Sequence, residues 1–104
     1  MAMHINTSHA GDKAVISLAG RFDFNDHRIF KTAYEPLLQQ AGLNTVEIDM
    51  AGVEYLDSSA LGMMMLMRER AQIAGKAVEL SRPNSTVAQI LEIANFSKLF
   101  TILK

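Results

Sequence analysis

The chain has 104 residues, 49% of them hydrophobic, and its 10 Lys and Arg against 11 Asp and Glu give a formal net charge of −1. This length suits one domain spanning residues 1–104, and the near-neutral charge without a basic cluster argues against direct contact with nucleic acid. The absence of cysteine excludes disulfides, cysteine–zinc sites and thiol catalysis.

The start of the chain and its apolar runs predict a cytoplasmic protein. Residues 1–13 contain neither the apolar stretch nor the cleavage pattern of a signal peptide. The longest uninterrupted apolar run, Met63–Met67, is far shorter than the roughly 20 residues that cross a bilayer. We therefore expect no contact with a membrane.

Two strands are predicted at the N-terminal end. Residues 3–9 alternate weakly between apolar and polar side chains, and residues 14–22 form a more apolar strand. The residues between them, 10–13, fit a turn in which Gly11 can adopt a positive φ. Together they favour an antiparallel pair whose first strand lies at the edge of a sheet.

A first helix is predicted over residues 27–42, with Asp26 expected to cap its start. Pro36 predicts a kink or break inside this helix, because proline lacks the backbone N–H of a helix interior, and Gly42 is expected to end the segment. The expected buried face has near-helical spacing and comprises Ile29, Phe30, Ala33, Leu37 and Leu38.

A third strand is predicted over residues 45–51, where apolar and acidic side chains alternate cleanly. The residues expected to point inward are Val46, Ile48 and Met50. Glu47 and Asp49 are expected on the opposite face. Residues 52–57 are then expected to form a loop.

A second helix is predicted from about Ser58 to Ala74, with Gly75 ending it. A rotation of about 100° per residue collects the expected core residues in one arc: Ala60, Met63, Met64, Met67, Ala71 and Ala74. Leu61 and Met65 fall outside this arc among polar neighbours. Two large apolar groups in such a place form either surface scatter or a contact patch.

The rest of the chain predicts a strand over 76–82, a helix over 85–95 and a final strand over 98–104. The apolar face of that helix holds Val87, Ile90, Leu91 and Ala94. The element order is ββαβαβαβ, in which helices between successive strands imply right-handed crossovers. We therefore predict an α/β fold with a mostly parallel, mixed sheet of about five strands, an N-terminal antiparallel pair and three main helices.

The triplet Asp57, Ser58 and Ser59 precedes the second helix and can serve two purposes. A Ser or Asp oxygen at a helix start accepts from a backbone N–H that lacks a partner, so the triplet is first of all a cap. The triplet also follows the carboxyl end of a strand, where open parallel sheets bind ligands and partners. A partner holding this helix end would also touch Leu61 and Met65, which lie within about two turns.

Three segments resemble the STAS domain, the fold of bacterial anti-sigma factor antagonists. Residues 46–62, VEIDMAGVEYLDSSALG, resemble the phosphorylation segment of that family, in which a hydrophobic strand and a short loop precede D-S-[ST]-G-L-G. Residues 16–23, ISLAGRFD, resemble its second strand, and residues 82–102 resemble its third helix and last strand. The resemblance covers nearly the whole chain.

This resemblance implies a regulatory protein that is not an enzyme and needs no cofactor or metal. In the family, the unphosphorylated antagonist binds an anti-sigma factor, a serine kinase of the histidine-kinase-like ATPase type, and so frees a sigma factor. The kinase phosphorylates the first serine, which corresponds to Ser58, and a PP2C-type phosphatase restores the binding form. The expected partner surface comprises Asp23, Asp57, Ser59, Leu61 and Met65.

Two features depart from the family pattern. Ala60 replaces the usual glycine, which should stiffen the first helical turn because Ala is favoured over Gly in a helix by about 1 kcal/mol. The sequence reaches Lys104 directly after the last predicted strand, where many members add a helix. We therefore expect that C-terminal helix to be short or absent, which would uncover part of the sheet or change how the partner sits.

A receiver domain is one alternative, because Asp57 follows a strand. Receivers need an acidic pair after the first strand and a lysine at the end of a later strand. Asp23 and Asp26 do not follow a first parallel strand in this way, so the pattern disfavours a receiver.

A hydrolase is a second alternative, with Ser58 or Ser59 as a nucleophile that needs an adjacent base. The sequence contains no G-x-S-x-G turn. His27, at the start of the first helix, is the histidine placed to border the serines. His4 and His9 lie on the predicted edge strand, where a surface role is favoured over metal binding.

A third alternative keeps the fold and changes the function. STAS-like domains also serve as interaction subunits of lipid transporters, stressosome-type complexes and sensor assemblies, some of which lack a phosphoacceptor. Ser58 favours the phosphorylation switch. The alternative is an interaction subunit of a transporter or signalling complex without a role in transcription.

Overall fold

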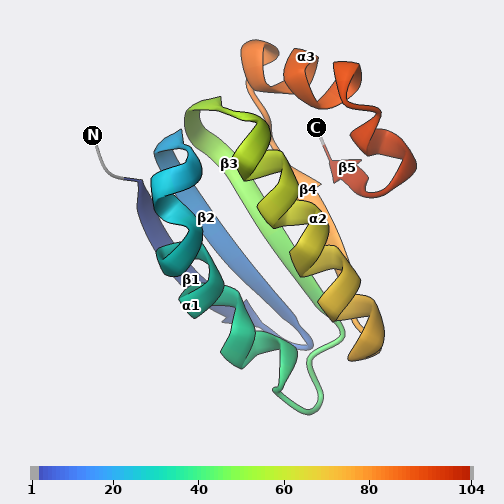
Figure 1. Cartoon of the computed structure of the whole chain (residues 1–104). Helices are drawn as coiled ribbons and strands as arrows, with labels where there is room; N and C mark the ends of the chain where they lie inside the picture. The colour runs from blue at the N-terminus through green and yellow to red at the C-terminus, as the bar shows by residue number, and fades with distance from the viewer. Residues whose placement is uncertain (1–2, 104) are drawn as a thin grey trace.

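The computed structural model describes residues 3–103, which form one five-stranded sheet and three α-helices (Figure 1). The strands are β1 (His4–Ala10), β2 (Lys13–Phe22), β3 (Thr45–Leu56), β4 (Ala77–Ser81) and β5 (Thr101–Leu103). The helices are α1 (His27–Leu38), α2 (Ser58–Ile73) and α3 (Ser85–Ile93), with the short 3-10 helices η1 (Phe24–Asp26) and η2 (Phe96–Lys98). The predicted element order is confirmed.

The strands lie across the sheet in chain order, from β1 at one edge to β5 at the other. β1 pairs antiparallel with β2, whereas β2, β3, β4 and β5 are parallel neighbours. The mixed sheet, its N-terminal antiparallel pair and the edge position of the first strand are therefore confirmed. Within residues 3–103, no helix is long and apolar enough to span a membrane.

The core lies between one face of the sheet and the helices α1 and α2, which lie side by side over it (Figure 1). Side chains alternate between the two faces of β2 and β3, and those that face the helices are fully or almost fully buried: Ile16, Leu18, Val46, Ile48 and Met50. From α2, Met63, Met64 and Met67 pack against them. Unbranched methionine side chains fill the irregular space between a helix and a twisted sheet.

β3 is longer than predicted, because residues 52–56 continue the strand and do not form a loop. The register between β2 and β3 shifts at two places, so the alternation of side chains breaks while the backbones remain paired. Gly52 lies at the first shift. A Cβ added there would lie 2.8 Å from the Cβ of Ala19, so only glycine allows the two strands to approach this closely.

Asp26 does not cap α1, contrary to the sequence-based prediction. Its side chain is buried and makes no cap hydrogen bond to α1. Instead, Asp23 caps η1, and the Asp26 carboxylate accepts from the Asp23 backbone N–H at 2.8 Å. The spacing of apolar residues did not reveal the 3-10 turn η1 before α1. The capping side chain is therefore Asp23, three residues before the predicted Asp26.

α1 ends at Leu38, four residues before Gly42 and two residues after Pro36. The last turn therefore contains the proline, and the chain closes with a bond from Gln39 N–H to the Pro36 carbonyl (3.3 Å). α1 therefore ends earlier than predicted and does not break in its middle, because the N–H that Pro36 lacks affects only the final turn.

Three smaller predictions were wrong. Ile29 of α1 is 43% exposed, because it borders an open groove between α1 and the polar edge strand β1. Ala74 lies beyond the end of α2 and is exposed. The last strand begins at Thr101 and not at Lys98, because η2 occupies the preceding residues.

Candidate functional site

The starts of α1, α2 and α3 gather at one end of the molecule (Figure 1). The helices follow β2, β3 and β4, which are parallel and therefore bring their carboxyl ends to the same edge of the sheet. In open α/β sheets this edge is where ligands and partners bind. The Asp57–Ser59 triplet lies there, as the sequence predicted.

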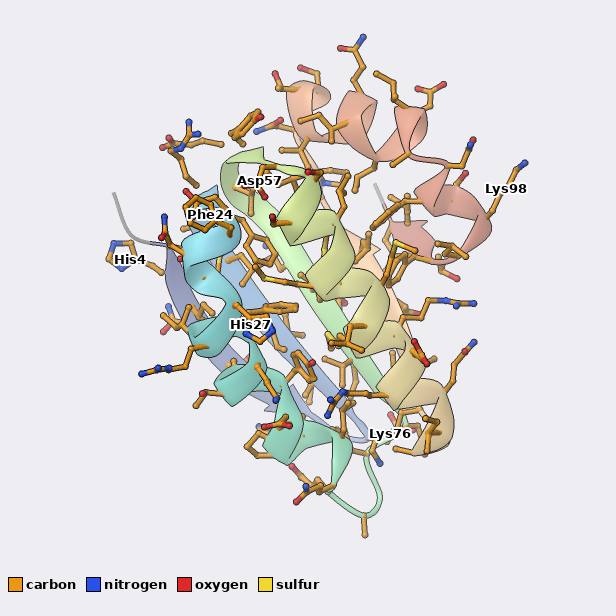
Figure 2. The ribbon with its side chains drawn as sticks, viewed as in Figure 1. His4, Phe24, His27, Asp57, Lys76 and Lys98 are labelled. Carbon is orange, nitrogen blue, oxygen red and sulfur yellow. The ribbon has the colours of Figure 1, made fainter. Side chains whose placement is uncertain are left out.

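Asp57 caps α2 and also reaches the segment after β2. Its Oδ1 accepts from the backbone N–H of Ala60 at 2.9 Å, and its Oδ2 accepts from the backbone N–H of Phe24 at 3.3 Å. Its own N–H donates to the Phe22 carbonyl at 3.3 Å. Figure 2 shows Asp57 and Phe24 at the same end of the molecule, on neighbouring segments.

Asp23 is half-buried and directly precedes η1, beside this cap. Its Oδ1 accepts from Asn25 N–H at 2.9 Å, and its N–H donates to Asp26 Oδ2 at 2.8 Å. The Asp23 side chain also accepts from the backbone N–H of Asp26, so Asp23 and Asp26 form a reciprocal capping box, which satisfies the free N–H groups of a short helix and fixes its shape. Asp23 thus builds the loop that lies next to the α2 start.

Ser58 and Ser59 are the first two residues of α2, and both are exposed. Neither residue is covered by neighbouring side chains. Backbone N–H groups in the first turn of a helix lack intrahelical acceptors and make this end attractive to negative charge. The site can therefore present a hydroxyl to another protein and accommodate an anion on it.

The surface of α2 differs in part from the predicted patch. Met65 is 46% exposed, as expected, but Leu61 is half-buried and packs against the core. Leu66, which the sequence analysis did not single out, is 37% exposed. Met65 and Leu66 line a groove of about 480 Å³ with Leu99. The exposed apolar pair on α2 is therefore Met65 and Leu66, while Leu61 is mainly a packing residue.

Two exposed aromatic residues beside the triplet were not predicted from the sequence. Phe24 is 67% exposed, and Tyr55 is 39% exposed with the Arg21 guanidinium 4.7 Å from its ring centroid. Arg21 and Tyr55 are paired across β2 and β3, in the part of β3 that was expected to be a loop. The sequence Val53-Glu54-Tyr55-Leu56 has a weak strand pattern, but it lies within the segment that was predicted to be a loop.

Comparison with known proteins identifies the family. The family model described as "Mlab, STAS domain" matches residues 5–103. The chain belongs to the STAS domain family. A STAS-domain containing protein of Pseudomonas aeruginosa (strain UCBPP-PA14) is 37% identical over 102 residues, which cover 98% of this chain and 99% of the relative.

Solved structures agree with this STAS assignment at the level of the fold. A candidate anti-sigma factor antagonist from Thermotoga maritima superposes with a TM-score of 0.85 at 19% identity, covering 96% of this chain and 86% of that one. SpoIIAA, an anti-sigma factor antagonist solved in its unphosphorylated form, gives 0.71 at 14% identity, covering 99% and 87%. A phosphorylated form of Bacillus SpoIIAA gives the same score and identity, covering 99% and 92%.

The histidines of this STAS domain do not converge on the serines. His27 is the first residue of α1 and lies on the side of that helix that faces α2 (Figure 2), where it lines a small pocket with Met63 and Leu66. These α2 residues lie at least one turn below Ser59. His4 and His9 are five positions apart on β1 and therefore point to opposite faces of the strand. These residues therefore assemble neither the base that the hydrolase alternative requires nor a histidine metal site.

Proposed function

We propose that this STAS domain is an anti-sigma factor antagonist. Its unphosphorylated form binds an anti-sigma factor serine kinase of the histidine-kinase-like ATPase type and thereby releases a sigma factor. Phosphorylation of Ser58 ends this binding, and a PP2C-type phosphatase restores it. The observation that carries the proposal is the exposure of Ser58 at the start of α2, directly after the cap residue Asp57.

The same position explains why phosphorylation would act on binding and leave the fold intact. A phosphoryl group adds about −1.5 to −2 charges at pH 7, and the start of α2 offers free N–H groups and the positive end of the helix dipole. In a protein–protein interface, however, the dianion would be desolvated beside the Asp57 carboxylate. A loss of about 3 kcal/mol lowers affinity more than 100-fold.

The proposed partner surface surrounds Ser58 at this end of the molecule. It consists of the residues predicted from the sequence, Asp23, Asp57, Ser59, Met65 and the half-buried Leu61, together with the exposed Leu66. Met65 and Leu66 offer apolar contact area, while Ser59 continues the exposed first turn of α2. Asp23 and Asp57 act mainly by fixing the backbone that the partner meets.

The proposal is tested by pull-down from the native lysate with wild type and Ser58→Ala, followed by intact-mass measurement. We expect capture of an ATPase-type serine kinase and a gain of about 80 Da on wild type alone. Ser59→Ala is the matched control and should keep the gain. A gain of the same size on Ser58→Ala would assign the modification to another residue and contradict the proposal.

A second candidate is an interaction subunit of a transporter or signalling complex without a role in transcription. The exposed apolar pair Met65 and Leu66 favours it, because such a surface suits a partner that stays bound. In that case Ser58→Asp would leave the complex intact, and Met65→Ala together with Leu66→Ala would dissociate it. Co-purification of the complex with each variant distinguishes the two functions.

A further inference from the structure

The Asp57 carboxylate links the start of α2 to Phe24, which lies 33 residues earlier in the chain than Asp57. One oxygen accepts from Ala60 N–H in the first turn of α2, and the other accepts from Phe24 N–H in η1. Ser58 is the next residue along the chain. A charge placed on Ser58 therefore acts directly on the group that ties η1 to α2.

η1 is otherwise stabilised from within. Asp23 and Asp26 exchange side-chain and backbone bonds, and Asp26 N–H also donates to the Asp23 carbonyl at 3.0 Å. The segment therefore has internal bonds that do not depend on the bond to Asp57. It presents Phe24 with 67% of its surface exposed.

A phosphoryl group on Ser58 would compete with Asp57 in two ways. Its oxygens seek the same free N–H groups at the start of α2, and its charge of about −1.5 to −2 repels the neighbouring carboxylate. The bond to Phe24 N–H, at 3.3 Å, is longer than the 2.9 Å bond to Ala60 N–H, so it is the weaker of the two.

We propose that Asp57 transmits the phosphorylation of Ser58 to η1, so that the phosphoryl group loosens the segment that presents Phe24. The proposal rests on the proposed function, because it takes Ser58 as the phosphoacceptor. The switch then has two parts: a charge at the α2 start and a change in how an exposed aromatic residue beside it is held.

The start of α3 provides a matched control within the same chain. Asn84 caps α3 by accepting from Val87 N–H at 2.8 Å, and Ser85 follows Asn84 as Ser58 follows Asp57. The second polar atom of Asn84 donates to the Val53 carbonyl at 2.8 Å. A phosphoryl group on Ser85 therefore meets a neutral cap that makes no bond to η1.

The experiment installs phosphoserine at position 58 by genetic encoding and measures hydrogen exchange of the Phe24 amide by NMR. We expect exchange to rise about fivefold, the change in an opening equilibrium produced by losing one hydrogen bond of ordinary strength. Phosphoserine at position 85 should leave the Phe24 amide unchanged. Asp57→Ser keeps a capping oxygen but lacks the second one, so it should raise Phe24 exchange without any phosphate.

The combination of phosphoserine 58 with Asp57→Ser tests whether Asp57 transmits the effect of the phosphoryl group to η1. If Asp57 carries the effect, the phosphoryl group adds little in this background. An unchanged Phe24 amide in the phosphorylated wild type would overturn the proposal, as would a full effect in Asp57→Ser or an equal rise at the core amide of Ile48. No kinase is used, so failure of a kinase to modify Ser58 would contradict the proposed function and leave this measurement standing.

Discussion

At the scale of single residues, the position of Ser58 allows a change in binding that leaves the stability of the fold nearly unchanged. Its side chain is exposed and lies at a helix start, where added negative charge meets free N–H groups. Substitutions there should therefore alter what binds to the surface more than they alter the stability of the fold.

Ser58→Asp tests this separation. We expect its thermal midpoint to stay within about 2 °C of wild type, because an acidic residue is tolerated in the first turn of a helix. Its affinity for the kinase partner should fall by about 100-fold or more. Ser85→Asp, at the same position of α3, is the control and should retain binding. Unfolding of Ser58→Asp, in place of a loss of binding, would show that the mechanism is wrong.

The two glycines Gly62 and Gly52 should respond in opposite ways to alanine. A Cβ added at Gly62 meets nothing within 4 Å, so Gly62→Ala should raise the free energy of unfolding by up to about 1 kcal/mol through helix propensity. Gly52→Ala should lower it, because its Cβ would lie 2.8 Å from that of Ala19. Urea unfolding of both variants checks the pair, and a stabilised Gly52→Ala would refute the close approach of β2 and β3.

At the scale of secondary-structure elements, the start of α3 is fastened to β3 by one side chain. The Asn84 carbonyl oxygen accepts from Val87 N–H, and its amide nitrogen donates to the Val53 carbonyl, both at 2.8 Å. The cap thus joins a helix to the extended end of the strand that leads into the Asp57 site.

Asn84→Ala should lower the free energy of unfolding by about 1–2 kcal/mol, because it removes both bonds. Asn84→Ser keeps a capping oxygen for Val87 N–H and lacks the donor to Val53, so its loss should be smaller. Chemical denaturation of the two variants gives the order. Wild-type stability in Asn84→Ser would mean that the bond to β3 contributes nothing.

At the scale of the whole molecule, a charge network stabilises the sheet face that is turned away from α1 and α2. Glu47 and Glu79 lie directly opposite each other on β3 and β4, and Lys13 contacts them at 2.8 and 3.0 Å. Hydrogen bonds from Lys13 and Ser81 lower the pKa of Glu47 below its ordinary value. Burial alone raises the pKa of Asp49, but hydrogen bonds from Arg82 and the Ala51 N–H outweigh it, so that pKa is also lowered.

This network predicts acid sensitivity. Because the folded pKa values of Glu47 and Asp49 are depressed, their contribution is fully present above the ordinary carboxylate pKa of about 4 and is lost as the pH falls through the folded values. Denaturation midpoints should therefore decline below about pH 4. Glu47→Gln should weaken this decline, whereas Glu69→Gln on the exposed surface of α2 should preserve it. An unchanged decline in Glu47→Gln would exclude this source.

The sequence by itself determined the element order, the mixed sheet, the buried methionines of α2 and the place of Ser58 at a helix start. Periodicity carries this information because it reports which face of each element is buried. The missed features concern segments whose local pattern is weak: the extension of β3, the Asp23 cap and the shortened α1.

Only the tertiary structure decided what surrounds Ser58. The bond from Phe24 N–H to Asp57 and the stacking of Arg21 on Tyr55 join residues more than 30 positions apart. Such contacts depend on the register and shifts of β2 against β3, which no local spacing encodes. The local hydrophobic pattern therefore places Ser58 at the start of α2, and long-range pairing of the β2 and β3 backbones determines which residues surround it.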